Sequence, residues 1–196
     1  MPKKVSVKKE EKKIEVSYSD AWIYILLLTT SLLLTQAIKN YTFEVGYINL
    51  TYSLFLLPIV YFIINLITKK YGYREAIKGI SISGISLVLF VVVIDLLSGN
   101  GFGFDNVYKE FCGYVVSSFV NLTIYYFLLS NTSMPSLLVF LNFIFVLIVN
   151  YFIYLLLGFN TLSLENFWIS YFSTLLIQAT ICAIISFIDR YIKRGV

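Results

Sequence analysis

Long apolar stretches alternate along the chain with short segments rich in Gly, Asn, Ser and charged residues. Six of these stretches have a length of roughly 20 residues, which is what a helix needs to cross a lipid bilayer. The connecting segments are short, so we expect neighbouring helices to be antiparallel. The pattern predicts an all-α integral membrane protein, a bundle of six transmembrane helices. The predicted ranges are 21–38, 47–68, 77–97, 111–129, 137–157 and 167–188.

The composition of the chain supports a membrane location. Of its 196 residues, 59% are hydrophobic and 13% are charged, whereas a typical soluble domain is about 25% charged. This balance excludes a secreted disulfide scaffold, a nucleic-acid module and most cytosolic enzymes. We therefore expect the lipid bilayer to be a partner of the protein, and we expect no nucleic acid to bind.

The basic residues sort to one side of the predicted bundle. Thirteen of the fifteen lysines and arginines fall in the N-terminal tail 1–20, between the second and third helices, or in the C-terminal tail 189–196. Cytoplasmic segments are enriched in Lys and Arg. Six helices also place both termini on the same side. The sequence therefore predicts two cytoplasmic tails that flank a transmembrane domain over 21–188.

Metal and cofactor sites would find few ligands in this sequence. The chain has no histidine, and its two cysteines, Cys112 and Cys182, lie in apolar stretches without a CxxC pair. Zinc, haem and iron–sulfur sites are built from such ligands. Nucleophile and phosphate-binding motifs are also missing. We expect no metal, no cofactor and no enzymatic activity.

Carboxamide side chains interrupt several of the predicted helices. They donate and accept hydrogen bonds at once, and inside a bilayer they must find partners. In the second helix, Tyr61 and Asn65 share one face after the mid-helix Pro58. Such residues either line a site for a neutral planar solute such as a nucleobase or hold helices together, and the sequence leaves both open. The candidate substrate-binding residues are Tyr61, Asn65, Asn121, Asn142, Asn150 and Gln178.

One ionisable residue, Asp95, lies inside an apolar run. Charged groups within a bilayer are costly and commonly functional. Only a few residues separate Asp95 from a polar loop, so its carboxylate either reaches the outer interface or faces the bundle. In the second case Asp95 is the candidate for coupling to protons or cations.

A distinctive spacing of residues surrounds the end of the second helix: Pro58, Tyr61, Asn65, Thr68, Lys69, Tyr71 and Gly72. This stretch resembles the queuosine-precursor transporter family, also called the vitamin uptake transporter family, whose pattern is P-x-x-Y-x-x-x-D-x-x-T-E-x-Y-G. The spacing is kept, while Asn65 and Lys69 replace the aspartate and glutamate of the family. In the later helices, Asn150 replaces another family aspartate, and Gln178 stands where the family often has a lysine.

The resemblance implies a six-helix transporter in the bacterial inner membrane that imports a 7-deazaguanine precursor of queuosine. The loss of the family's charged residues leaves the substrate and any coupling ion open. If the two halves of the chain are related, they form inverted three-helix repeats, a common way of building a transport site at the bilayer midplane. Asn65 and Asn150 would then occupy corresponding helices.

Two other functions remain open. A substrate-binding membrane subunit would need an energising partner complex, which would dock on a face of small residues such as Gly79, Ser83 and Ser86. A non-transporting scaffold protein would instead have a packed core without a pocket among the candidate residues. Assembly into a homo-oligomer is compatible with each of these functions.

Overall fold

The computed structural model describes residues 18–38, 41–45, 48–98 and 104–131, together with isolated positions between 145 and 184. Within these residues it contains four helices and a two-stranded sheet. In chain order the elements are α1 (Tyr18–Ala37), β1 (Thr42–Val45), β2 (Ile48–Thr51), α2 (Ser53–Tyr71), α3 (Tyr73–Leu97) and α4 (Phe104–Asn131). The fifth and sixth predicted helices fall largely outside these ranges, so the six-helix bundle and its repeats stay predictions.

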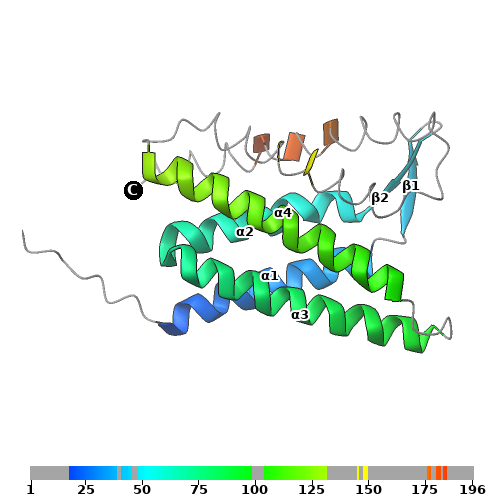
Figure 1. Cartoon of the computed structure of the whole chain (residues 1–196). Helices are drawn as coiled ribbons and strands as arrows, with labels where there is room; N and C mark the ends of the chain where they lie inside the picture. The colour runs from blue at the N-terminus through cyan, green and yellow to red at the C-terminus, as the bar shows by residue number, and fades with distance from the viewer. Residues whose placement is uncertain are drawn as a thin grey trace, which may run out of the picture.

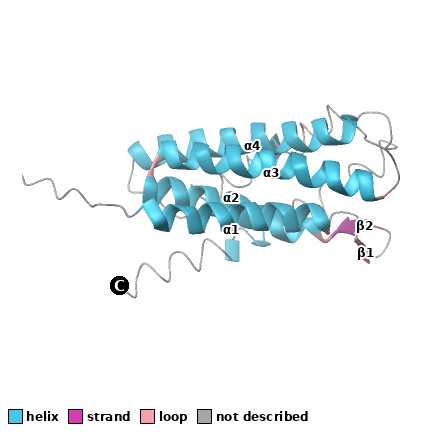
Figure 2. Cartoon of the chain, turned by 90° about the horizontal axis from the view of Figure 1, so that it is seen from below, coloured by secondary structure: helices cyan, strands magenta, loops and turns pink. Residues whose placement is uncertain are grey.

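Successive helices run in opposite directions and lie side by side (Figure 1). α2 and α3 each pack against both α1 and α4, so they form the centre of the described part. The β1–β2 hairpin lies at one end of the bundle, and the turn between α2 and α3 lies at the other (Figures 1 and 2). The short connections in the sequence predicted this antiparallel order.

Three of the described helices are long and apolar enough to cross a membrane. These segments are Asp20–Ala37, Tyr73–Leu97 and Val107–Leu128. Their buried share is only 28% to 39%, so many of their apolar side chains face outward. On α3 the exposed residues Ile85, Leu89 and Val93 recur every four positions, which places them in one stripe. Water disfavours such an apolar stripe, whereas lipid tails solvate it.

Aliphatic side chains fill the core between α1, α2 and α3. Leu28 of α1, Ile67 of α2 and Ile80 of α3 are fully buried. Gly79 allows α3 to approach α1 closely, because a Cβ atom there would stand 3.4 Å from Cγ1 of Ile25. A side chain larger than alanine at this position would push the two helices apart.

The prediction that the second helix begins at residue 47 is wrong. β1 and β2 form an antiparallel hairpin in which Thr42 pairs with Thr51, and α2 begins only at Ser53. The described residues are nevertheless mostly helical, as the all-α prediction expects, and the short hairpin is an addition to that class. Both strands carry β-branched residues, which favour extended backbone. The hairpin is tied to the start of α2, because the ring of Phe43 lies 5.0 Å from that of Tyr52.

The other described helices extend beyond their predicted ranges. α1 begins at Tyr18, inside the predicted tail, and α3 begins at Tyr73 instead of residue 77. α4 covers Phe104–Asn131 instead of 111–129. The added turns contain polar residues, which lower the local hydropathy, yet the backbone hydrogen bonds of a helix continue through them. Hydropathy therefore predicts the apolar centre of each helix better than its ends.

Gly72 alone separates α2 from α3. Its φ of 89° and ψ of 176° belong to a region of backbone conformation that glycine adopts and other residues avoid. The N–H group of Gly72 donates to the carbonyl of Thr68 at 3.0 Å, and its own carbonyl accepts from the N–H group of Ala76 at 3.3 Å. A single residue thus closes one helix and opens the next.

Candidate functional site

Two candidate residues on α2 meet one candidate residue on α4. The side-chain amide of Asn121 donates to Oδ1 of Asn65 at 2.9 Å, and it also lies 3.4 Å from the backbone oxygen of Tyr61. None of the three residues is more than 3% exposed. Tyr61 and Asn65 are one helical turn apart on the same face of α2, so both can contact α4 at this point. We name this group the carboxamide cluster: Tyr61, Asn65 and Asn121.

The carboxamide cluster contains one unsatisfied donor. The side-chain nitrogen Nδ2 of Asn65 is buried and has no hydrogen-bond partner in the part of the chain that the structure describes. Leaving such a group without a partner costs about 1–3 kcal/mol. An acceptor atom supplied by a ligand would remove this cost. The nitrogen of Asn65 is therefore the point of the cluster with unused binding capacity.

A second polar contact joins α2 to α4. The hydroxyl oxygens of Tyr61 and Ser117 lie 2.6 Å apart, and the Ser117 hydroxyl donates to the carbonyl of Gly113. Because a serine hydroxyl has a single hydrogen, Tyr61 is the donor in the contact between the two side chains. Ser117 was not among the predicted site residues. Its position one turn before Asn121 was the available signal, since that spacing places both residues on one face.

Ser83 and Tyr114 extend these contacts to α3. Their hydroxyl oxygens lie 2.6 Å apart, and both residues are buried. The sequence did not predict this pair, because no spacing pattern links a serine in one helix with a tyrosine in the next. Uncharged polar groups thus connect α2, α3 and α4 inside the apolar bundle.

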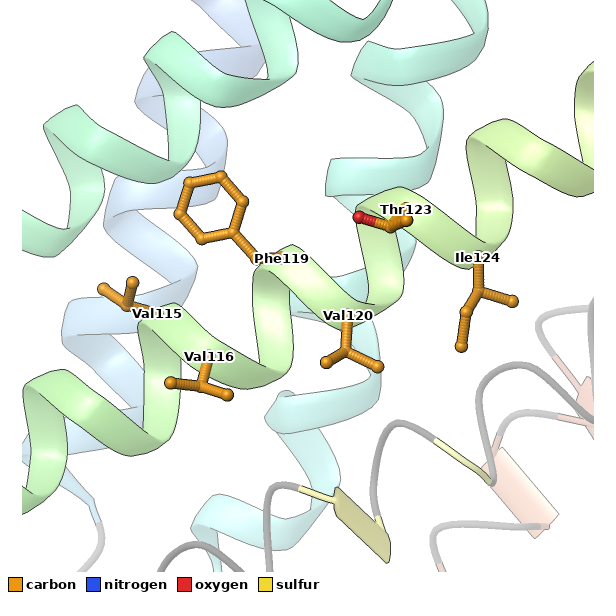
Figure 3. Close-up of a pocket in the computed structure, with 6 residues that line it drawn as sticks. All are labelled: Val115, Val116, Phe119, Val120, Thr123 and Ile124. Atoms are coloured by element: carbon orange, nitrogen blue, oxygen red, sulfur yellow. The ribbon is translucent and has the colours of Figure 1, made fainter.

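A hollow of about 420 Å³ runs along α4 (Figure 3). It is lined by Val115, Val116, Phe119, Val120, Thr123 and Ile124. The described part of its wall is apolar apart from the Thr123 hydroxyl. The residues of the carboxamide cluster do not line this hollow, since they are packed between α2 and α4. The described lining of the hollow therefore lacks the groups that would recognise a polar ring.

Asp95 lies in the last turn of α3 and is half-buried. Its Oδ2 atom is buried and has no hydrogen-bond partner within the described ranges. The next residue, Leu96, is 61% exposed, so this turn lies at the edge of the bundle. In these ranges no hydrogen bond or ion pair joins Asp95 to the carboxamide cluster. A role in ion coupling stays a prediction.

The remaining candidate residues Asn142, Asn150 and Gln178 lie outside the described residues. The structure therefore brings together three of the six predicted substrate-binding residues. A search of the described residues for three or more His, Cys, Asp or Glu side chains that could hold a metal ion finds none.

The small residues of α3 make contacts inside the bundle. Gly79 packs against α1 and α2, and Ser83 contacts Tyr114. Ser86 is half-buried and donates to the carbonyl of Ile82 at 2.9 Å. Gly79 and Ser83 are consequently not available to dock an energising partner.

The site thus consists of uncharged, hydrogen-bonded side chains held between helices, with one donor unused. Comparison of the chain with protein families, with curated proteins and with solved structures finds no match in any of the three.

Proposed function

We propose that the protein is a membrane transporter that binds a small, uncharged, planar solute between α2 and α4. The observation that carries this proposal is the buried Asn65–Asn121 pair with its unused donor. Asn and Gln side chains can bond two atoms on the edge of a base at once. By its resemblance to the queuosine-precursor transporters, the chain would import a 7-deazaguanine precursor across a bacterial inner membrane, with both termini cytoplasmic.

The chemistry of the cluster supports a neutral ligand. Tyr61, Asn65 and Asn121 carry no charge, and neither do their neighbours Ser83 and Ser117. An ionic ligand buried here would need an opposite charge to offset its desolvation. A ring with adjacent donors and acceptors needs only the hydrogen bonds that carboxamides offer.

Ligand binding requires α2 and α4 to separate, because the carboxamide cluster is closed between them. Pro58 lies inside α2, one turn before Tyr61. Proline cannot donate the backbone hydrogen bond of a helix, and helices bend at such positions. We propose that α2 bends at Pro58 to open the cluster during alternating access.

A membrane scaffold protein is the second candidate function. The same residues support it, since they are buried and line neither of the two hollows described here. Interhelical hydrogen bonds between polar side chains hold membrane helices together with about 0.6–2 kcal/mol each. In that case the Asn65–Asn121 pair would serve only to hold α2 against α4.

Ligand binding distinguishes the two functions. The purified protein would be heated with 7-deazaguanine precursors, nucleobases and vitamins, and its melting temperature recorded. A ligand at 100 times its dissociation constant stabilises the folded state by about 2.7 kcal/mol. A transporter should be stabilised by at least one of these classes. A protein stabilised by none of them would favour the scaffold.

Uptake of a labelled 7-deazaguanine precursor, measured in cells that cannot synthesise it, tests transport directly. We expect Asn65→Ala to abolish uptake, because it removes the unused donor. Ser86→Ala is the matched control, since among the described residues the Ser86 hydroxyl bonds to the Ile82 carbonyl of its own helix. Normal uptake by an Asn65→Ala protein that is present in the membrane would contradict the assigned site.

A further inference from the structure

Basic and aromatic side chains meet where α2 ends beside the start of α1. Lys69 and Lys70 occupy the last turn of α2, and both are exposed. The ammonium of Lys70 lies 5.0 Å from the centre of the Tyr24 ring and 5.3 Å from that of Tyr71. The two rings pack edge to face at 5.6 Å. Contacts of this kind hold a lysine in place without cancelling its charge.

A hollow of about 350 Å³ opens at this position. Tyr24, Leu66, Lys69 and Lys70 line it. The two ammonium groups form a rim that can bind negatively charged oxygen atoms, while Leu66 contributes an apolar wall. The hollow therefore combines a cationic part and an apolar part, and it needs a ligand with both properties.

The apolar side of the hollow continues along α1. Leu27 lies one turn after Tyr24 on the same side of the helix, and it is 50% exposed. Ile23, next to Tyr24, is 65% exposed. A hydrocarbon chain attached to a group in the hollow would find an apolar surface here. A free inorganic anion would make no use of it.

Neighbouring charges leave the hollow positive. On α3, Glu75 pairs with Lys78, so its carboxylate is already compensated. Arg74 is exposed and adds another positive charge nearby. On α1, Asp20 is an exposed acidic group one turn before Tyr24. Among these described groups the four basic residues Lys69, Lys70, Arg74 and Lys78 outnumber the two acidic residues Asp20 and Glu75, so this end of the bundle carries a net positive charge.

We propose that this hollow binds the phosphate group of an anionic lipid, with the acyl chains lying along α1. The lysines would contact the phosphate oxygens, and Leu66 would contact the glycerol region of the lipid. In the predicted orientation this end of the bundle is cytoplasmic, where anionic lipids attract basic segments. The site lies at the opposite end of α2 from the β-hairpin and does not depend on the proposed transport function.

Binding of phosphatidylglycerol to the purified full-length protein, measured by native mass spectrometry, tests this site. Phosphatidylcholine provides the neutral reference lipid. The double variant Lys69→Gln plus Lys70→Gln removes both rim charges. The double variant Arg74→Gln plus Lys78→Gln removes two positive charges from the same end of the bundle but leaves the hollow intact. Both changes affect exposed side chains, so both proteins should fold.

We expect the rim variant to lower the preference for phosphatidylglycerol by about 30-fold, the factor for two lysines at an anionic surface. The matched control should change it less than about 3-fold. An equal loss in both variants would show that only the general positive field matters and would overturn the site. Displacement of the lipid by excess inorganic phosphate would assign the hollow to a free anion and would also overturn the proposal.

Discussion

The side-chain amide of Asn121 donates to Oδ1 of Asn65 at 2.9 Å, joining α4 to α2 across 56 residues of sequence. Both residues of this contact are buried between the helices. Polar groups in such surroundings bond to each other or remain unsatisfied. One atom of the pair, Nδ2 of Asn65, has no hydrogen-bond partner among the residues that the structure describes. The pair is therefore a link between the two helices, and under the proposed function it is also the place where the solute binds.

The energy of this link can be measured with a double-mutant cycle. Asn65→Ala, Asn121→Ala and the double variant would be unfolded in detergent, and their free energies of unfolding compared. We expect a coupling of about 0.6–1.7 kcal/mol, the range found for hydrogen bonds between membrane helices. Strictly additive losses would mean that the two carboxamides do not interact in the folded protein.

The two substitutions that break the contact between Tyr61 and Ser117 should lower the free energy of unfolding by different amounts. Tyr61→Phe removes a donor and leaves Ser117 bonded to the carbonyl of Gly113, so we expect a loss of about 0.5–1.5 kcal/mol. Ser117→Ala leaves the fully buried Tyr61 hydroxyl without this acceptor, and we expect a loss of about 1–3 kcal/mol. The same unfolding assay compares them. A larger loss for Tyr61→Phe would reverse the assigned donor and acceptor.

Replacing Gly72 by any other residue should lower the stability of the protein. A Cβ atom at Gly72 meets nothing within 4 Å, so the penalty of Gly72→Ala comes from its φ of 89° alone. We expect about 1–3 kcal/mol of lost stability. The control is Gly79→Ala, a change within a helix where the nearest atom stands at 3.4 Å, and where alanine improves helix propensity by about 1 kcal/mol. Equal effects of the two changes would contradict this explanation.

Anion binding at the rim lysines should not vary with pH in the physiological range. The hydroxyl of Tyr71, and to a lesser degree that of Tyr24, raises the pKa of Lys70 above its ordinary value of 10.5. Lys70 therefore stays charged until the pH exceeds that value. We expect constant affinity for phosphatidylglycerol from about pH 6 to 9, measured by native mass spectrometry. A decline within this range would indicate that a different group controls binding.

The sequence predicted the centres of the four described helices and one face of α2. Tyr61 and Asn65 share that face because they are four residues apart, a relation that helical geometry determines. Which helix lies opposite is decided by packing. No pattern in the sequence pairs Asn65 with Asn121, or Ser83 with Tyr114, although the carboxamides themselves indicated where partners would be needed.

The hairpin and the lysine hollow could not be predicted from hydropathy. Ile48 and its neighbours are apolar enough to be read as the first turn of a helix, but pairing with β1 satisfies their backbone groups instead. Lys70 and Tyr24 are 46 residues apart and meet only because α1 and α2 are antiparallel. Local composition gives no information about a contact between residues so far apart in the sequence.

The single-residue turn at Gly72 also constrains how the protein enters the membrane. With only Gly72 between them, α2 and α3 form a helical hairpin whose joined ends must stay on the same side of the membrane. In the predicted orientation the tip of that hairpin, with its cluster of basic residues, never has to cross the lipid. The segment that must be translocated ahead of α2 is residues 39–52, in which Lys39 and Glu44 are the charged residues. In that predicted orientation, biogenesis would move a nearly uncharged stretch outward and would keep the basic turn in the cytoplasm.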